Sequence, residues 1–431
     1  MTRFAPAGPL RGAYAPPPDK SISHRAALFG AMSSGPVAVR NYLDAEDTRS
    51  TLRAVAVLGA RVEDLGSGDL VVHGVGLRGP SEAPDAIDVG NAGTLLRLLP
   101  GWLAGQEERT FRLDGDESIR RRPVDRVVAP LRRMGAVLDA CDGRLPPLEV
   151  TGSALVGVDH ELAVASAQVK SCLLIAGLVA QGRTRVLEPA PSRDHTERML
   201  ARAGVALERE NGAVGVAQAE ELALDEVRVP GDPSSAAFLV AAACIVPGSR
   251  LTVEGVGLNW TRTGFLQIAR RMGASIEGDL EAPGAVGADE PIGSLEVSAH
   301  GLQATAVEAD EVPLAIDELP LVALLGAFAE GETVVRGAAE LRVKESDRIA
   351  GVVDGLGALG AVIEATAGGF VVRGTGGLRG GVIESRGDHR LAMLGAVAGI
   401  ASRDGVEVRG MEAAAISYPG FEADLGRLLA G

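Results

Sequence analysis

Aromatic residues, cysteine and lysine are scarce in this chain of 431 residues. Phe, Trp and Tyr make up 3% of it, which disfavours the stacking platforms that bind single-stranded nucleic acids. Three cysteines without CxxC spacing exclude a disulfide framework and a typical zinc site, and we interpret Cys141, Cys172 and Cys244 as small hydrophobic side chains. No apolar run approaches the ~18 residues of a membrane span, and no signal-peptide core is present, so we expect a cytoplasmic protein.

Positive charge is also in deficit. The formal net charge of −15 disfavours nucleic acid or an anionic membrane as the main partner. It leaves room for small anionic ligands, which need only a local cluster of cations. Apolar residues make up 46% of the chain, enough for large cores, and the length predicts two or three lobes.

Lysine is rarer than the count of basic residues suggests. Of 42 basic residues only Lys20, Lys170 and Lys344 are lysine, and the rest are arginine. A composition this biased keeps lysine where a compact ammonium, or one that can release its proton, is required. All three lie in polar motifs that open apolar helices, which indicates functional positions.

A repeat organises the sequence. A polar cluster, an apolar helix, a small-residue turn and a short β-branched strand recur six times, the signature of a repeat architecture. The six helices are expected at 19–32, 91–104, 166–180, 232–245, 317–329 and 388–400.

A second helix and a hairpin are predicted between successive copies. Their joints carry glycine at positions 59, 135, 204, 273 and 360. The sixth copy is truncated, and its missing strand could come from segment 1–14. The pattern predicts an α/β protein of six βαβαββ repeats, three per lobe, with lobes 15–228 and 229–431 plus 1–14.

The polar residues of each copy lie at a helix start, where backbone N–H groups are unpaired and the helix dipole is positive. Capping explains Asp232 and Ser234. Capping does not explain Lys20, Arg25 or Lys170, nor Gln168 and Arg390 in equivalent turns, because cations there oppose the dipole. Several such helix starts together predict a receptor for anionic ligands.

The polar motifs are individually weak but occur in a fixed order. They are PDKSISHR (18–25), GNAGTLLR (90–97), RRRPVDR (120–126), SAQVKS (166–171), SRDHTER (192–198), DELP (317–320), LRVKESDRIA (341–350) and GDHRLAM (387–393). Together they resemble the enolpyruvyl transferase family of 5-enolpyruvylshikimate-3-phosphate synthases (3-phosphoshikimate 1-carboxyvinyltransferases). The resemblance runs from about Gly12 to Phe421.

The resemblance implies a fold and a reaction. The fold is a two-lobed inside-out α/β barrel of six βαβαββ units. The reaction transfers the enolpyruvyl group of phosphoenolpyruvate to the 5-hydroxyl of shikimate 3-phosphate and releases phosphate, a step of aromatic amino-acid biosynthesis. It implies no metal or organic cofactor, no nucleic-acid or membrane partner, and a monomer. We expect shikimate 3-phosphate to drive closure of the lobes.

The resemblance also assigns residues. For shikimate 3-phosphate it implies contacts from Lys20, Ser21, Arg25, Ser166, Ala167, Gln168, Ser192, Arg193, Asp317 and Lys344. For phosphoenolpyruvate it implies contacts from Lys20, Asn91, Gly93, Arg122, Gln168, Arg348 and Arg390. Arginine suits these substrates because its planar fork matches carboxylate and phosphate.

The reaction needs a base for the 5-hydroxyl and an acid for the methylene carbon. Asp317, at a helix start, is the expected base. Glu345 is the first candidate for proton transfer at carbon, although Lys344 and Arg348 beside it favour an ionised carboxylate. Lys20 is the alternative donor.

Two features depart from the family pattern. Many members carry a C-terminal lysine that contacts phosphoenolpyruvate, whereas Ile416 or Ser417 stands near that place here. The motifs SAQVK, RDHTE and NWTR resemble the subgroup often associated with glyphosate tolerance, but Gly93 has the form usual in the sensitive subgroup. Inhibitor response stays open.

Two other functions compete. The enolpyruvyl transferase that acts on UDP-N-acetylglucosamine shares the donor, but its cysteine in the loop before RPVD is absent from DGDESIRRRPVD. A non-catalytic binding protein would have lost catalytic positions, yet Lys20, Asp317, Glu345 and Arg348 are present. The sequence therefore favours the shikimate reaction.

Overall fold

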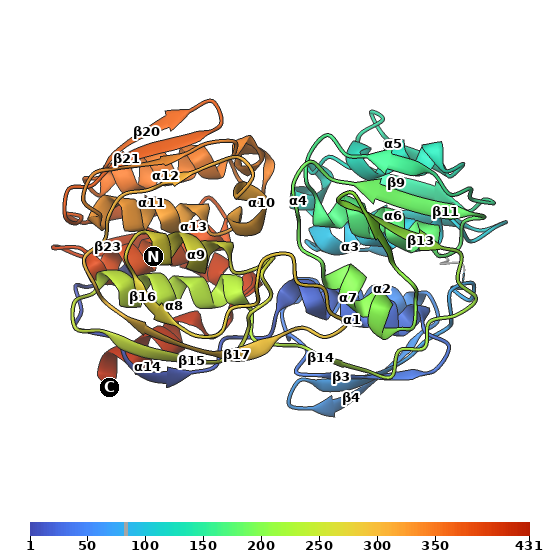
Figure 1. Cartoon of the computed structure of the whole chain (residues 1–431), viewed down its shortest axis with the longest axis horizontal. Coiled ribbons are helices and arrows are strands. Elements are labelled where there is room, and N and C mark those ends of the chain that lie inside the picture. Colours follow the sequence, from blue (N-terminus) through green and yellow to red (C-terminus); the bar gives the residue numbers. More distant parts are fainter. Residues whose placement is uncertain (82–84) are drawn as a thin grey trace. The chain divides into compact units, whose positions relative to one another are not determined.

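The computed structural model describes residues 1–81 and 85–431, which divide into two compact units (Figure 1). Unit 1 comprises Met1–Pro17, Pro230–Ala285 and Pro291–Gly431, and unit 2 comprises Pro18–Val229 and Val286–Glu290. In the part of the chain that is described, no helix is long and apolar enough to cross a membrane.

Unit 2 contains three repeats, each with a first and a second helix. The first helices are α1 (Lys20–Met32), α3 (Gly93–Leu103) and α6 (Ala167–Gly177). The second helices are α2 (Glu46–Val57), α5 (Asp125–Arg133) and α7 (His195–Arg202), and a short α4 (Glu117–Arg120) precedes α5.

Each repeat of unit 2 carries a four-stranded sheet in which a parallel pair of strands is followed by an antiparallel hairpin. The first sheet has the order β14 (Glu226–Arg228), β3 (Pro36–Arg40), β5 (Asp69–His73) and β4 (Arg61–Gly66). The second has the order β6 (Ile87–Asp88), β7 (Thr110–Asp114), β9 (Leu145–Thr151) and β8 (Val137–Cys141). The third has the order β10 (Asp159–Glu161), β11 (Arg183–Leu187), β13 (Ala213–Ala217) and β12 (Glu208–Glu210).

Unit 1 repeats this plan. Its first helices are α8 (Pro233–Ile245), α11 (Leu319–Phe328) and α13 (His389–Ala401). Its second helices are α9 (Gly264–Arg271), α12 (Arg348–Ala358) and α14 (Phe421–Ala430), with short turns at α10 (Val312–Ala315), η1 (Ala339–Val343) and η2 (Met411–Ile416).

Two of its sheets have the same order as those of unit 2: β2 (Arg11–Tyr14), β15 (Arg250–Gly257), β17 (Ile292–Ser298) and β16 (Ser275–Glu277); and β18 (Ala306–Val307), β19 (Glu332–Val335), β21 (Gly369–Arg373) and β20 (Val362–Thr366). The third has three strands, β22 (Gly381–Glu384), β23 (Val406–Arg409) and β1 (Thr2–Phe4).

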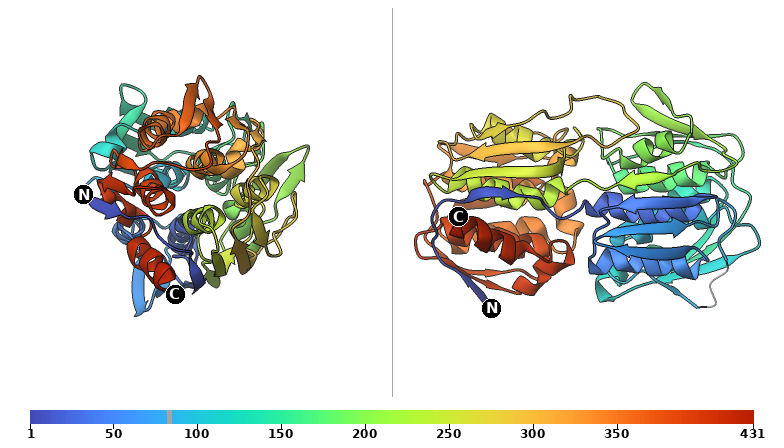
Figure 2. Two further views of the ribbon diagram at one scale, coloured as in Figure 1. Left: turned by 90° about the vertical axis from the view of Figure 1, so that its left-hand side faces the viewer. Right: turned by 90° about the horizontal axis from the view of Figure 1, so that it is seen from below.

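The N-terminal segment completes two repeats of unit 1. Strand β1 pairs antiparallel with β23, so it supplies the strand that the truncated sixth copy lacks, as the sequence predicted. Strand β2 pairs in parallel with β15 and so completes the sheet of the fourth repeat as well. Figure 2 shows this blue segment beside the red C-terminal elements. The six-repeat α/β prediction is confirmed.

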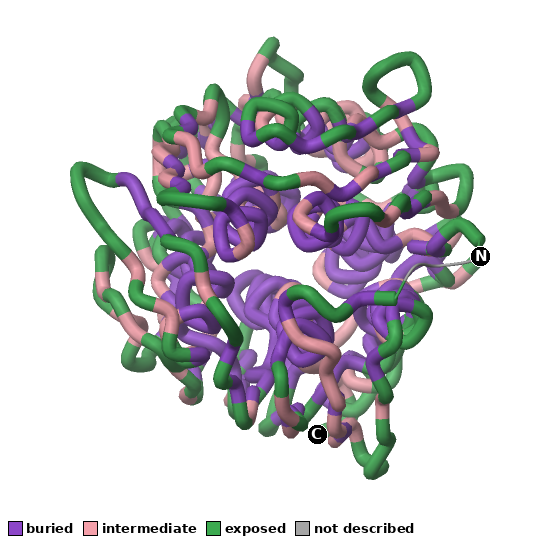
Figure 3. Tube along the Cα trace, turned by 90° about the vertical axis from the view of Figure 1, so that its right-hand side faces the viewer, coloured by how far each residue is buried: buried purple, intermediate pink, exposed green. Residues whose placement is uncertain are grey.

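The first helices of the repeats are almost entirely buried, because each unit surrounds them with its sheets. Every residue of α8 is buried, and α8, α11 and α13 pack against one another. The strands alternate, as β11 shows, with Thr184 and Val186 buried and Arg183 exposed. Figure 3 shows the buried stretches lying inward and the exposed turns at the periphery. Polar side chains at the helix starts are therefore held by a rigid core.

The three cysteines differ in burial. Cys172 and Cys244 are buried in helices, and burial raises the pKa of each thiol to about 12. Cys141 is exposed, because it falls on the outward-facing positions of β8. Its interpretation as a small hydrophobic side chain stays a prediction.

Glycine is required at two kinds of position. The five joint glycines all have left-handed backbones, with φ between 83° at Gly204 and 102° at Gly59. Gly101 serves close packing instead, since a Cβ there would lie 2.2 Å from the carbonyl oxygen of Cys172 on the adjacent helix α6.

The packing at Gly101 predicts a loss of stability in Gly101→Ala. Because the added methyl meets backbone that cannot rotate away, the thermal unfolding midpoint should fall by about 5 °C or more. Scanning calorimetry measures this. Gly426→Ala, in helix α14 with nothing within 4 Å of its Cβ position, is the control and should keep or raise the midpoint. An unchanged midpoint in Gly101→Ala would contradict the packing argument.

His160 in β10 predicts a pH dependence of stability. Burial, together with the charge of Arg133, lowers the pKa of its imidazole from 6.5 to about 4. The unfolded chain therefore binds a proton more readily, so this contribution to stability is complete above pH 6.5 and is lost as the pH falls towards 4.

His160→Gln should accordingly flatten the fall of the unfolding midpoint between pH 6.5 and 4. His300→Gln, at an exposed site, should leave the slope unchanged. Equal slopes in the wild type and His160→Gln would contradict the assignment.

Candidate active site

Three helices of unit 1 begin at charged side chains that contact one another. Asp317 lies two residues before α11, Arg348 is the first residue of α12, and Asp388 is the N-cap of α13. The repeat brings these helix starts together because the three helices share one core. We call the group the Arg348 cluster; it consists of Asp317, Glu318, Lys344, Glu345, Arg348, Asp388 and Arg390.

The guanidinium of Arg348 is the centre of this cluster. It donates from Nε to Asp388 Oδ2 over 2.8 Å, from Nη1 to Asp317 Oδ1 over 3.1 Å and from Nη2 to Glu345 Oε2 over 2.6 Å. Its side chain is 1% exposed. Burial alone would lower the pKa of Arg348, but the three carboxylates outweigh burial and raise it.

Asp317 is surrounded by cations. Besides Arg348, its Oδ1 lies 3.7 Å from Lys344 Nζ, and its Oδ2 lies 3.6 Å from Arg390 Nη2. Its side chain remains 14% exposed. A carboxylate held this way is oriented, favoured in its charged form and open on one side, which are the properties a general base needs.

Asp388 holds Arg348 in place within the cluster. It caps α13 by accepting from the backbone N–H of Arg390 over 2.9 Å and also accepts from the hydroxyl of Ser346 over 2.9 Å. Burial raises the pKa of Asp388, but the charges of Arg348 and His389 outweigh it and leave the pKa below its ordinary value. Asp388 is therefore an ionised anchor for Arg348.

Unit 2 holds a cationic group around Arg25 of helix α1. We call it the Arg25 cluster; it consists of Ser21, Arg25, Ser171, Arg193 and Thr196. Arg25 donates to Thr196 Oγ1 over 2.8 Å and to Ser171 Oγ over 2.9 Å, while Arg193 donates to Ser21 Oγ over 3.4 Å. Burial lowers the pKa of Arg25 to about 10 against the opposing charge of Glu197. Two arginines and a serine brought together in this way can bind a phosphate.

The start of α6 carries the SAQVK motif. Ser166 caps the helix, with its Oγ accepting from the N–H of Val169 over 3.4 Å. The Glu188 carboxylate accepts from the Ser166 backbone N–H and from the Ser192 hydroxyl, both over 2.8 Å. Ser166 and Ser192 are thus joined by one carboxylate.

Lys170, also in that motif, is buried between two carboxylates of the protein. Its Nζ lies 2.7 Å from Glu188 Oε2 and 2.8 Å from Glu197 Oε1. Burial by itself lowers the pKa of Lys170, but these two charges outweigh it and raise the pKa. The negative charge that the sequence argument sought from a ligand is supplied here by the protein.

Lys20 is paired in a similar way. Its Nζ lies 3.2 Å from Asp47 Oδ2, and His24 Nε2 lies 3.6 Å from the same oxygen. Burial raises the pKa of Asp47, but Lys20 and His24 outweigh it and hold the pKa well below its usual value. His24 also binds Thr51 through Nδ1 at 2.6 Å, so this histidine orients a carboxylate that in turn fixes Lys20.

Gly93 and Gln168 lie beside arginines. A Cβ on Gly93 would come within 2.4 Å of Arg122 Nη1, so only glycine leaves the guanidinium in this place. Gln168 accepts from Arg97 over 3.0 Å and donates to Thr94 Oγ1 over 3.2 Å. The starts of α3 and α6 are therefore linked by side chains.

The structure distributes the predicted site residues over both units. Unit 1 brings together Asp317, Lys344, Glu345, Arg348 and Arg390. Unit 2 holds Lys20, Ser21, Arg25, Asn91, Gly93, Arg122, Ser166, Ala167, Gln168, Ser192 and Arg193. The Asn91 amide contacts Glu46 at 3.5 Å.

Sequence reasoning missed the supporting residues. Arg97 and Asp388 lie inside recognised motifs, and their charge at a helix start was the available signal. Asp47, Glu188 and Glu197 gave no local signal as partners, because their importance depends on lysines 18 to 27 residues away.

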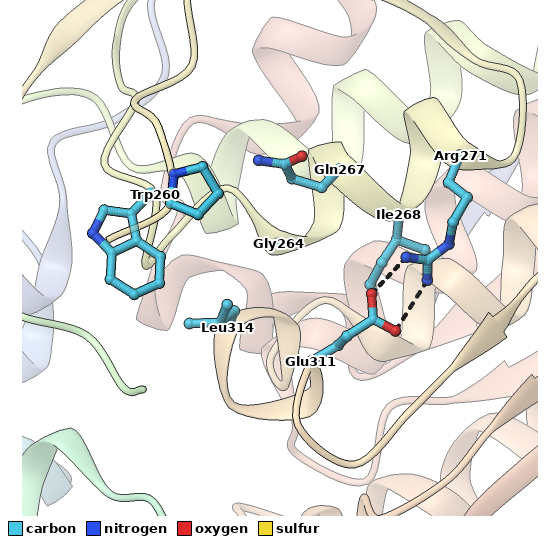
Figure 4. Close-up of a pocket in the computed structure, with 8 residues that line it drawn as sticks. Trp260, Gly264, Gln267, Ile268, Arg271, Glu311 and Leu314 are labelled. Atoms are coloured by element: carbon cyan, nitrogen blue, oxygen red, sulfur yellow. Dashed lines mark hydrogen bonds and ion pairs between the residues drawn. The ribbon is translucent and has the colours of Figure 1, made fainter. Parts of the chain in front are cut away.

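Within residues 1–81 and 85–431, no group of three or more His, Cys, Asp or Glu side chains could hold a metal ion. A cavity of about 350 Å³ in unit 1 is lined by Trp260, Ile268, Arg271, Glu311 and Leu314, among others. Figure 4 shows the Arg271–Glu311 pair on one wall and the indole ring on another. The cavity contains none of the predicted site residues.

Comparison with known proteins agrees along the whole chain. The model of the family EPSP synthase (3-phosphoshikimate 1-carboxyvinyltransferase) matches residues 4–425. A 3-phosphoshikimate 1-carboxyvinyltransferase of Geobacter sulfurreducens is 47% identical over 426 residues, covering 98% of each chain. One of Bacillus subtilis is 44% identical over 421 residues, covering 97% of each.

Solved structures give the same result. An EPSP synthase from Acinetobacter baumannii matches with a TM-score of 0.87 and 39% identity, covering 99% of this chain and 97% of that one. The enolpyruvyl transferase NikO from Streptomyces tendae matches with a TM-score of 0.79 at 19% identity, covering 99% and 96%, which shows a shared fold. The chain therefore belongs to the EPSP synthase (3-phosphoshikimate 1-carboxyvinyltransferase) family.

Proposed function

We infer that the chain carries out the reaction of its family. It transfers the enolpyruvyl group of phosphoenolpyruvate to the 5-hydroxyl of shikimate 3-phosphate, giving 5-enolpyruvylshikimate 3-phosphate and inorganic phosphate. The observation that carries this proposal is the Asp317 carboxylate, which is held by Arg348 at 3.1 Å beside Lys344 and Arg390 and remains partly exposed. A base surrounded by cations suits this reaction, because the hydroxyl that it deprotonates belongs to an anionic substrate.

Residues of both units bind shikimate 3-phosphate in this proposal, with 15–228 as the lobe that carries most of them. One cationic group consists of Ser21 and Arg25 of α1 with Arg193, which precedes α7. Ser166 and Ser192 share the Glu188 carboxylate. The α6 start adds the Ala167 backbone and the Gln168 amide. Lys344 and Asp317, from lobe 229–431 plus 1–14, complete the set.

Phosphoenolpyruvate binds to arginines in this proposal. Arg122, Arg348 and Arg390 provide the charge, while Lys20, Asn91, Gly93 and Gln168 provide further contacts. The buried Arg390 Nε has no hydrogen-bond partner among the described residues, so this arginine retains a donor for a ligand oxygen. Arg348 acts mainly by orienting carboxylates, because its guanidinium already binds three of them.

The reaction is an addition followed by an elimination. Asp317 takes the proton of the 5-hydroxyl as its oxygen attacks the central carbon of phosphoenolpyruvate, and the methylene carbon receives a proton. Protonation turns the methylene carbon into a methyl group. Removal of a proton from this methyl group then expels phosphate and restores the double bond. Arg348 holds Glu345 as a carboxylate at 2.6 Å, so we assign Glu345 to proton removal in the elimination and Lys20 to donation in the addition.

The proposed reaction also bears on where the protein works and on its oligomeric state. Both substrates are phosphorylated anions that do not cross membranes unaided, which supports a cytoplasmic location. The fold supplies both groups of binding residues from one chain, which supports a monomer.

Asp317→Asn tests the proposed base. Phosphate release from phosphoenolpyruvate with shikimate 3-phosphate should fall about 10²–10⁴-fold in kcat, because the amide cannot accept the hydroxyl proton. Glu311→Gln, a carboxylate six residues upstream that binds Arg271, is the matched control and should keep wild-type kcat. Calorimetric binding of shikimate 3-phosphate verifies that the variant site is intact.

The acceptor is tested in the same assay with UDP-N-acetylglucosamine. Phosphate release with this sugar nucleotide alone would contradict shikimate 3-phosphate as the acceptor. An undiminished kcat in Asp317→Asn would contradict Asp317 as the base. Absence of release with both acceptors, while ligands still bind, would identify a binding protein.

Gly93→Ala tests the role of Arg122. The added methyl overlaps Arg122 Nη1, the mobile end of a side chain, so the guanidinium should turn away while the fold is kept. We expect the KM for phosphoenolpyruvate to rise about tenfold, the scale of one charge-assisted hydrogen bond, with the KM for shikimate 3-phosphate nearly unchanged. Arg122→Lys should give the same selectivity. A rise confined to the KM for shikimate 3-phosphate would show that Arg122 binds shikimate 3-phosphate instead of phosphoenolpyruvate.

A further inference from the structure

A short segment between β16 and β17 belongs to unit 2 although the residues on either side of it belong to unit 1. We call Val286–Glu290 the strap. The chain leaves unit 1 after Ala285 and returns at Pro291, and between these points it contacts helix α7. The proposed reaction assigns no role to the strap.

The carboxylate of Glu290 holds the first residue of α7. Glu290 Oε1 lies 2.6 Å from His195 Nδ1, and the two side chains are 9% and 1% exposed. An ionised carboxylate can only accept, so Nδ1 carries the proton and donates it. A short, buried, charge-assisted bond of this kind fixes the imidazole in orientation.

The strap's backbone holds the next turn of the helix. Arg198 Nη1 donates to the Asp289 carbonyl oxygen over 2.8 Å, and Arg198 Nε lies 3.0 Å from both carboxylate oxygens of Asp194. Asp194 is the N-cap residue of α7, but its side chain binds Arg198 instead of capping the helix. The start of this eight-residue helix therefore depends on contacts with other segments.

The same turn of α7 contacts Arg25, which is proposed to bind shikimate 3-phosphate, and Lys170 beside it in unit 2. Thr196 accepts from Arg25 Nε over 2.8 Å, and Glu197 binds Lys170 at 2.8 Å. Arg193, two residues before the helix, reaches Ser21. The negative charge of Glu290 also favours the charged form of Arg25 and raises its pKa, against the larger effect of burial.

We propose that Glu290 is a positioning residue for shikimate 3-phosphate: through His195 it fixes the first turn of α7, and thereby Thr196, Arg25 and Arg193. This inference rests on the proposed function. Its consequence is selective. Loss of Glu290 weakens the binding of shikimate 3-phosphate and leaves the chemical step intact, because the ion pairs that hold Asp317, Glu345 and Arg348 come from residues of unit 1.

The test compares Glu290→Ala and Glu290→Gln in the full chain by calorimetric binding of shikimate 3-phosphate and by steady-state kinetics. Glu290→Ala should raise both the Kd and the KM for shikimate 3-phosphate about tenfold, as expected when a charge-assisted hydrogen bond supporting the site is lost. At saturating shikimate 3-phosphate, kcat and the KM for phosphoenolpyruvate should stay within about twofold of wild type. Glu290→Gln keeps an acceptor for His195 without the charge, so its Kd should lie between those of wild type and Glu290→Ala.

Asp225→Asn is the matched control, because Asp225 is an exposed carboxylate paired with Arg202 in the last turn of the same helix. It should leave the Kd for shikimate 3-phosphate unchanged. A general structural role for the strap would lower the unfolding midpoint of Glu290→Ala and raise both KM values equally, and that result would overturn the inference.

Arg25→Ala separates this inference from the proposed function. If Arg25→Ala binds shikimate 3-phosphate as tightly as wild type, the proposed site is wrong. If Arg25→Ala loses binding while Glu290→Ala and Glu290→Gln keep it, the site stands and the role of Glu290 is wrong. Should Glu290→Ala fail to fold, Glu290→Gln decides, since a Kd equal to that of wild type would refute the proposal.

Discussion

The ion pairs of the buried Arg348 guanidinium are the interaction on which the Arg348 cluster of unit 1 depends. A guanidinium removed from water costs several kcal/mol unless charged partners surround it. Asp388, Asp317 and Glu345 provide those partners, and together they bind all three guanidinium nitrogens. Because these carboxylates come from the starts of α11, α12 and α13 or from the turns before them, one side chain fixes the relative positions of three helix starts.

The same principle operates in unit 2 with other residues. Lys170 is enclosed by Glu188 and Glu197, and Glu188 also holds Ser166 and Ser192. Charged side chains at helix starts are thus neutralised by the protein before any ligand arrives. A chain with a net charge of −15 can therefore present cations to anionic substrates, because the surplus acidic residues include the anchors of those cations. The site is ordered in advance, which reduces the entropy lost on binding.

The sequence was sufficient for features that depend on local pattern. The six helices, their strands and the left-handed joint glycines follow from periodicity and turn chemistry, and the motifs located Lys20, Asp317 and Arg348. It was insufficient for partners that only the fold brings together. Glu290 lies 95 residues from His195, and no pattern in the loop around it marks a carboxylate that holds a distant helix.

The rarity of lysine finds its explanation in these pairs. Lys20 contacts Asp47, Lys170 contacts Glu188 and Glu197, and Lys344 contacts Asp317, so every lysine of the chain is bound to a carboxylate near a helix start. Arginine would need room for a planar fork with five donors, and between Glu188 and Glu197 a single nitrogen lies within 2.8 Å of both oxygens. In the proposed mechanism the ammonium of Lys20 also releases a proton to carbon, which a guanidinium resists. Geometry thus favours lysine over arginine at position 170, and the proposed proton transfer favours it at position 20.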